Sequence, residues 1–120
     1  MTSFAFPRGE ASIRAKNLLS KHFAVCRGSW PGINSGLIDL SQLKCYGIDQ
    51  QMQRFSLQNI VSQARKSNGW LVFNTHDVTN NPSPYGCTPE QLDVVLKTVL
   101  DAGFLVLPMK SALGRVAFTV

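Results

Sequence analysis

His76 is the residue whose type and position best suit chemistry in this chain of 120 residues. It follows an apolar stretch, residues 70–75, that is typical of a buried strand, and a long polar loop comes after it. In folds of alternating strands and helices, functional groups lie at the carboxyl ends of the strands. A histidine there is a candidate catalytic residue, although a lone histidine is more often structural than catalytic. Its neighbour Asp77 points the other way in extended backbone and could brace the loop.

Other polar residues follow predicted strands as well. They are Pro7-Arg8-Gly9, Arg27 and Lys110. In a parallel sheet these strand ends share one edge, so the groups could converge with His76. Proline, glycine and polar residues are also common in turns for conformational reasons alone. A shared site and a set of ordinary turns both remain open.

The ligand types needed for a metal site are sparse. The sequence contains only two histidines, His22 and His76, and it has no His-x-x-x-His motif and no adjacent pair of aspartates. Its three cysteines, Cys26, Cys45 and Cys87, are too few and too far apart for a thiolate zinc site. We expect them to be buried, reduced thiols that pack as small apolar residues. The sequence also lacks a nucleophile elbow and a phosphate-binding glycine loop.

Strands and helices alternate along the chain. The clearest helix start is at Thr88, an N-cap residue followed by Pro89 and by Gln91, which completes a capping box. Alternation of this kind predicts one α/β domain, residues 1–120, with a mainly parallel sheet that is either open or part of a barrel. The predicted strands are 3–6, 23–26, 43–46, 70–75 and 104–107, and the predicted helices are 10–20, 56–67, 89–102 and 111–116.

Composition excludes several classes of protein. With 44% apolar and 16% charged residues the chain is globular. The net charge of +5 is scattered, with no basic run longer than Arg65-Lys66, so we expect no nucleic-acid partner. No segment approaches the ~20 apolar residues that span a membrane. The N-terminus lacks the basic and apolar regions of a signal peptide, so we expect a cytoplasmic protein.

Three segments resemble a known family in their order and spacing. They are Ser-Phe-Ala-Phe-Pro-Arg-Gly-Glu at 3–10, Val-Cys-Arg-Gly with Pro-Gly-Ile-Asn at 25–34, and Asn-Thr-His-Asp-Val with Pro-Ser-Pro-Tyr-Gly-Cys-Thr-Pro at 74–89. Together they are similar to the C-terminal half of polysaccharide deacetylases, which form carbohydrate esterase family four and contain the NodB homology domain. The resemblance covers about residues 3–114. It implies the second half of a distorted (β/α) barrel, from a bacterial family that uses a divalent metal such as zinc to hydrolyse N- or O-acetyl groups on a sugar polymer.

The resemblance also implies roles for individual residues. His76 matches the histidine that protonates the leaving amine, and the backbone N–H of Arg8 matches an oxyanion donor. The residues matched to substrate binding are Pro7, Trp30, Asn74, Asp77 and Tyr85. The family's base, an aspartate in an Asp-Asp motif, and its His-x-x-x-His metal ligands are not in this sequence. The resemblance therefore assigns no metal ligand to this chain.

These expectations define two main functional hypotheses and a third that rests on less. In the first, the chain is the second half of a deacetylase, through truncation, gene fission or a start-site error. It would then be inactive alone, and would pair with a missing N-terminal half or form a homodimer to act on a polysaccharide or oligosaccharide. In the second, it is a non-catalytic carbohydrate-binding or interaction module in which Trp30 and Tyr85 stack on sugars, with Trp70 placed in the core. A third reading, a basic nucleic-acid binder, rests only on the charge.

Overall fold

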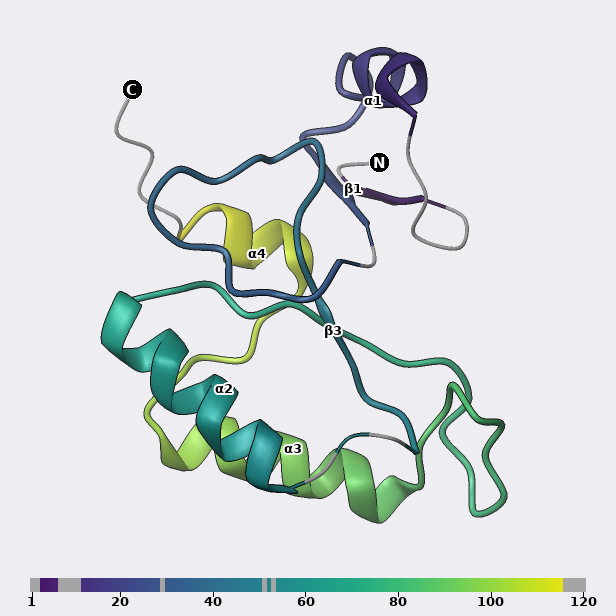
Figure 1. The fold of residues 1–120 in the computed structure, drawn as a ribbon, viewed down its shortest axis with the longest axis vertical. Coiled ribbons are helices and arrows are strands. Elements are labelled where there is room, and N and C mark those ends of the chain that lie inside the picture. Colours follow the sequence, from purple (N-terminus) through teal and green to yellow (C-terminus); the bar gives the residue numbers. More distant parts are fainter. Residues whose placement is uncertain (1–2, 7–11, 29, 51, 53, 116–120) are drawn as a thin grey trace.

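The chain folds into short parallel strands and four helices, in a computed structural model that describes residues 3–6, 12–28, 30–50, 52 and 54–115 (Figure 1). The mixed α/β class is therefore confirmed. The elements in chain order are β1 (Ser3–Ala5), α1 (Ile13–Leu19), β2 (Val25–Arg27), β3 (Tyr46–Gly47), α2 (Arg54–Ser67), β4 (Phe73–Asn74), α3 (Pro89–Asp101) and α4 (Met109–Leu113).

The strands form two separate two-stranded sheets. Strand β1 pairs in parallel with β2, and β3 pairs in parallel with β4. Between the two pairs, Leu43 forms a parallel bridge with Arg27, and its amide donates to the Cys26 carbonyl at 2.8 Å. The parallel arrangement matches the alternation of strands and helices in the sequence.

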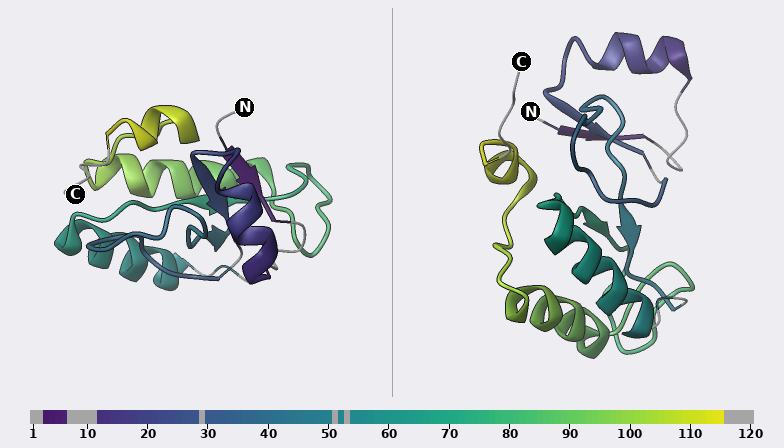
Figure 2. Two further views of the ribbon diagram at one scale, coloured as in Figure 1. Left: turned by 90° about the horizontal axis from the view of Figure 1, so that it is seen from above. Right: turned by 60° about the vertical axis from the view of Figure 1, so that its left-hand side comes forward.

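The strand that leads to His76 separates two apolar clusters. Leu71 and Phe73 pack with Leu57, Val61, Val95 and Val99 in the cluster that α2 and α3 form with Ile48 and Cys87. Trp70 and Val72 pack in the second cluster, with Val25, Leu43, Cys45 and residues of α4. Successive side chains therefore go to opposite faces, as extended backbone requires. Figure 2 shows α2 and α3 side by side, away from α1 and β1.

Local sequence signals set the helix starts. The Thr88 side chain accepts from the Gln91 amide and the Gln91 side chain accepts from the Thr88 amide, so the predicted capping box is confirmed. Ser12 caps α1 in a similar way, accepting from the Ala15 amide at 3.1 Å. Each cap satisfies an amide that has no partner within its helix.

The predicted strands 23–26 and 43–46 are shifted to Val25–Arg27 and Tyr46–Gly47, and two further strand predictions differ more from the structure. Residues 104–107 form no strand, and Leu105 and Val106 are 65% and 51% exposed. The predicted strand 70–75 is reduced to Phe73–Asn74, preceded by an antiparallel bridge between Trp70 and Asn34. An apolar, β-prone run forms a strand only where a neighbouring strand satisfies its backbone, and no described strand pairs with 104–107.

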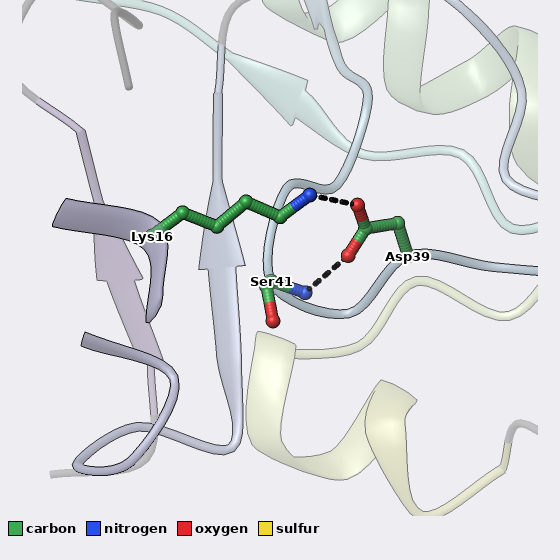
Figure 3. A network of polar contacts seen from close by, with 3 residues as sticks. All are labelled: Lys16, Asp39 and Ser41. Atoms are coloured by element: carbon green, nitrogen blue, oxygen red, sulfur yellow. Dashed lines mark hydrogen bonds and ion pairs between the residues drawn. The ribbon is translucent and has the colours of Figure 1, made fainter. Parts of the chain in front are cut away.

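Helix α1 is tied to the loop before β3 by an ion pair. The Lys16 ammonium donates to the Asp39 carboxylate at 2.5 Å, and the other carboxylate oxygen accepts from the Ser41 amide at 3.0 Å (Figure 3). These contacts lower the pKa of Asp39, with the Lys16 hydrogen bond as the largest cause. Because the Asp39 side chain is half exposed, water screens the pair and its contribution to stability is small.

All three cysteines are buried and unpaired, as expected from the sequence. Burial raises the pKa of the Cys26 thiol. Among the described helices, none has the length and apolar character needed to cross a bilayer.

Candidate functional site

His76 lies at the carboxyl end of the strand that contains β4, and its side chain is exposed. The preceding residue anchors the backbone, since the Thr75 hydroxyl donates to the Ile48 carbonyl at 2.7 Å. The His76 ring lies beside the Tyr85 ring, with centroids 5.8 Å apart and planes inclined by 50°. Two aromatic rings from separate parts of the loop therefore meet at one exposed place.

Asp77 braces the loop that carries Tyr85. Its carboxylate accepts from the Ser83 amide at 2.8 Å and from the Ser83 hydroxyl at 2.6 Å. These two hydrogen bonds are the main reason that the pKa of Asp77 is lowered, and His76 adds a smaller effect of the same sign. The structure thus places the Asp77 carboxylate in the loop's own hydrogen bonding, which is the bracing role considered from the sequence.

Backbone contacts close the base of this loop. The Cys87 amide donates to the Asp77 carbonyl at 2.9 Å, and the Thr79 amide donates to the Cys87 carbonyl at 3.1 Å. Gly86 is buried and packs closely against Asp77. A Cβ at position 86 would therefore overlap both the carboxylate and the carbonyl of Asp77. Only glycine allows this close approach.

Gln50 links the loop to the rest of the fold, and sequence reasoning did not single it out. Its side-chain amide donates to the Gly86 carbonyl at 3.0 Å and to the Gln91 side chain at 3.0 Å. Gln91 in turn belongs to the capping box of α3. The loop is therefore held at its base by the backbone bonds of Cys87, at Ser83 by the Asp77 carboxylate and at Gly86 by Gln50. No local pattern around Gln50 would have revealed this.

The other predicted site residues have different surroundings. Pro7 and Arg8 lie outside the described residues. Asn74 is half-buried, and its carbonyl accepts from the Ile48 amide at 2.7 Å within the β3–β4 pair. Trp30 is 71% exposed in the segment after β2. Within the described part of the chain, no ring contact joins Trp30 to His76 or Tyr85.

Arg27 and Lys110, the remaining strand-end candidates, do not join this group. The Arg27 guanidinium donates to the Gly28 carbonyl at 3.0 Å and to the Cys45 sulfur at 3.4 Å, so it serves local structure. Lys110 is on α4 and does not follow a strand, since 104–107 form none. Of the described candidates, only His76, Asp77 and Tyr85 are brought together.

The described residues do not fit the metal that the family resemblance implies. Nowhere among them do three or more histidine, cysteine or acidic side chains lie close enough together to hold an ion. Comparison of the chain with family models, with curated proteins and with solved structures finds no match.

The exposed side chains of His76 and Tyr85 could each interact with a bound molecule in a different way. An exposed imidazole can give a proton to a bound molecule or take one from it. A phenol ring that is 68% exposed, like that of Tyr85, offers a flat apolar face and a polar tip, which suits the face of a sugar ring. Hydrogen bonds at several points fix the backbone of the loop that carries Tyr85.

Proposed function

We propose that this chain is the C-terminal portion of a polysaccharide-deacetylase-like domain, equivalent to the second half of a (β/α) barrel. The reaction is hydrolysis of an N- or O-acetyl group on a sugar polymer, and it requires groups that this sequence does not supply. The observation that carries the proposal is the exposed His76 at the end of a parallel strand, beside Tyr85 on a braced loop. The order of the matching sequence segments supports it as well.

In this proposal His76 is the general acid. Its protonated ring gives a proton to the nitrogen or oxygen that leaves when the acetyl group is removed. Tyr85 holds the sugar ring next to His76 by stacking, and Asp77 positions Tyr85 through its bonds to Ser83. Pro7, Asn74 and Trp30 are proposed to contact the substrate, and the backbone N–H of Arg8 is proposed to stabilise the oxyanion. The base and metal ligands must come from residues outside these 120, so no step through a metal is assigned to this chain.

A non-catalytic carbohydrate-binding module is the second candidate. The large exposed rings of Tyr85 and Trp30 favour it, since both could stack on sugars without any chemistry. The two candidates differ in one respect that can be measured. Stacking needs Tyr85 but no proton from His76, whereas deacetylation needs both.

Complementation would test the proposal. The purified chain should release no acetate from acetylated chito-oligosaccharides. Co-expression with an N-terminal deacetylase half that contains the Asp-Asp and His-x-x-x-His motifs should restore turnover. His76→Ala should then reduce turnover by ~100-fold or more, the usual scale for loss of a general acid. His22→Ala is the matched control, because His22 is also an exposed histidine.

Each result discriminates between the candidates. Robust turnover by the chain alone, abolished by a chelator, would refute the requirement for missing groups. Failure of complementation, together with oligosaccharide binding that Tyr85→Ala abolishes and His76→Ala preserves, would favour the binding module. Equal effects of His76→Ala and His22→Ala on restored turnover would remove His76 from the mechanism.

A further inference from the structure

Along one edge of the segment 70–74, which contains β4, backbone groups have no hydrogen-bond partner among the described residues. The amide of Tyr46 donates to the Val72 carbonyl and that of Ile48 to the Asn74 carbonyl, so even-numbered residues of this strand face β3. Trp70 likewise exchanges two bonds with Asn34. The N–H and C=O groups of Leu71 and Phe73 therefore point to the opposite edge. No described strand pairs with that edge.

A groove of about 920 Å³ runs along this open edge. Residues 70–75 form one side of it, residues 103–107 with Met109 form the other, and Val95 and Val99 of α3 contribute apolar side chains. Leu105 and Val106 are exposed here although they are apolar. The groove thus combines unpaired strand backbone with apolar side chains, which is the combination that accepts an added strand.

The charged side chains that line the groove are all positive. Among the described residues that line it, the only charged side chains are those of Arg65 and Arg115. Arg65 lies one turn before Gly69 and reaches Gly103, where an added Cβ would come within 2.9 Å of its Nη1 atom. Arg115 follows α4, whose Met109 and Leu113 pack in the same cluster as Trp70. Both arginines are thus at the end of the groove where the strand begins, and no described carboxylate forms an ion pair with either.

We propose that this groove binds an extended, mainly apolar segment of a partner polypeptide, which adds to β4 as a strand and places an acidic side chain between Arg65 and Arg115. The open backbone groups supply the hydrogen bonds, alternate side chains of the ligand enter the apolar groove, and the two arginines set its register. A second copy of this chain is the alternative occupant, and the test below distinguishes it from a partner segment. This inference does not depend on the proposed function.

Peptide binding to the full chain would test the inference. The probes are fluorescein-labelled Glu-Val-Thr-Val-Thr-Val and Val-Thr-Val-Thr-Val-Glu, which place the acid at either end, and the same peptides with Lys in place of Glu. At least one acidic peptide should bind saturably, about tenfold or more tighter than its lysine counterpart, since close opposite charges favour binding. The double variant Arg65→Glu with Arg115→Glu should reverse that preference. Binding of the lysine peptides to the double variant would then show that the variant is folded and that its groove is intact.

Amide hydrogen exchange measured by NMR gives the structural readout. On binding, the Leu71 and Phe73 amides should become protected, whereas the Asn74 amide, which already faces β3, should change little. A peptide with N-methyl groups on alternate amides should not bind, because it cannot complete the ladder. The inference is overturned by absence of saturable binding up to about 1 mM, by equal binding of the N-methylated peptide, or by binding without protection of Leu71 and Phe73. A stable dimer that excludes the peptides would assign the edge to a second copy and also overturn it.

Discussion

The side chain and the backbone of Asn34 donate to the same acceptor, the carbonyl of Trp70. The Asn34 amide N–H lies 3.1 Å from that oxygen and the side-chain Nδ2 lies 3.2 Å from it. The Asn34 side chain also accepts from the Lys44 amide at 3.0 Å and donates to the Lys44 carbonyl at 2.9 Å. One residue thus joins the segment before β3 to the strand that leads to His76.

Asn34→Ala should therefore destabilise the protein substantially. Asn34 is only 6% exposed, and its loss would remove the part-buried hydrogen bonds that its side chain makes with the Lys44 amide and carbonyl and with the Trp70 carbonyl. We expect the free energy of unfolding to fall by about 2–4 kcal/mol in urea denaturation. The control is Asn81→Ala in the exposed loop, which should change stability by less than ~0.5 kcal/mol. Equal effects of the two changes would show that the Asn34 contacts contribute nothing.

The pKa of Asp77 should depend on Ser83. Because the Ser83 hydrogen bonds lower the pKa of Asp77 in the folded chain, its carboxylate contributes stability above the ordinary aspartate pKa. That contribution is lost as the pH falls below about 4, through the lowered folded value. Carbon-13 NMR titration of the Asp77 carboxyl group should show this, and Ser83→Ala should move the pKa back upward. No change of pKa in Ser83→Ala would contradict the assignment.

Gly86→Ala should open the loop that presents Tyr85. The added Cβ would collide with Asp77, so the backbone must move and the bond from Cys87 to the Asp77 carbonyl must lengthen. A cost of about 1–3 kcal/mol is expected, typical of overpacking. Gly114→Ala is the matched control, because a Cβ there makes only an ordinary contact of 3.5 Å with the Ser111 carbonyl. If both changes are neutral in thermal denaturation, the close approach at Gly86 is not required.

His76→Ala should cost little stability. The ring is exposed and its removal creates no cavity, so the free energy of unfolding should change by less than ~1 kcal/mol in urea. Leu57→Ala is the reference for a core position, since Leu57 is fully buried between the helices, and it should cost about 2–5 kcal/mol. A loss of comparable size at His76 would make it a structural residue and would weaken the proposed catalytic role.

Local signals in the sequence determined several parts of the structure. The capping box at Thr88 and the helix that it starts were predicted correctly, because a cap depends only on residues within one turn. The helix predicted at 56–67 is present as α2, two residues longer at its start. The position of His76 after an apolar strand was also evident from the sequence alone.

Only the tertiary structure decided which backbone groups are paired and which side chains meet. The run 104–107 has strand-like residues, yet a strand exists only where a second segment satisfies its hydrogen bonds, and local sequence does not identify that segment. For the same reason Asn34, in a predicted loop, was not recognised as the residue that joins Lys44 to Trp70. The contact of His76 with Tyr85 depends on the path of the loop between them, which Asp77, Gln50 and Gly86 fix through contacts across the fold.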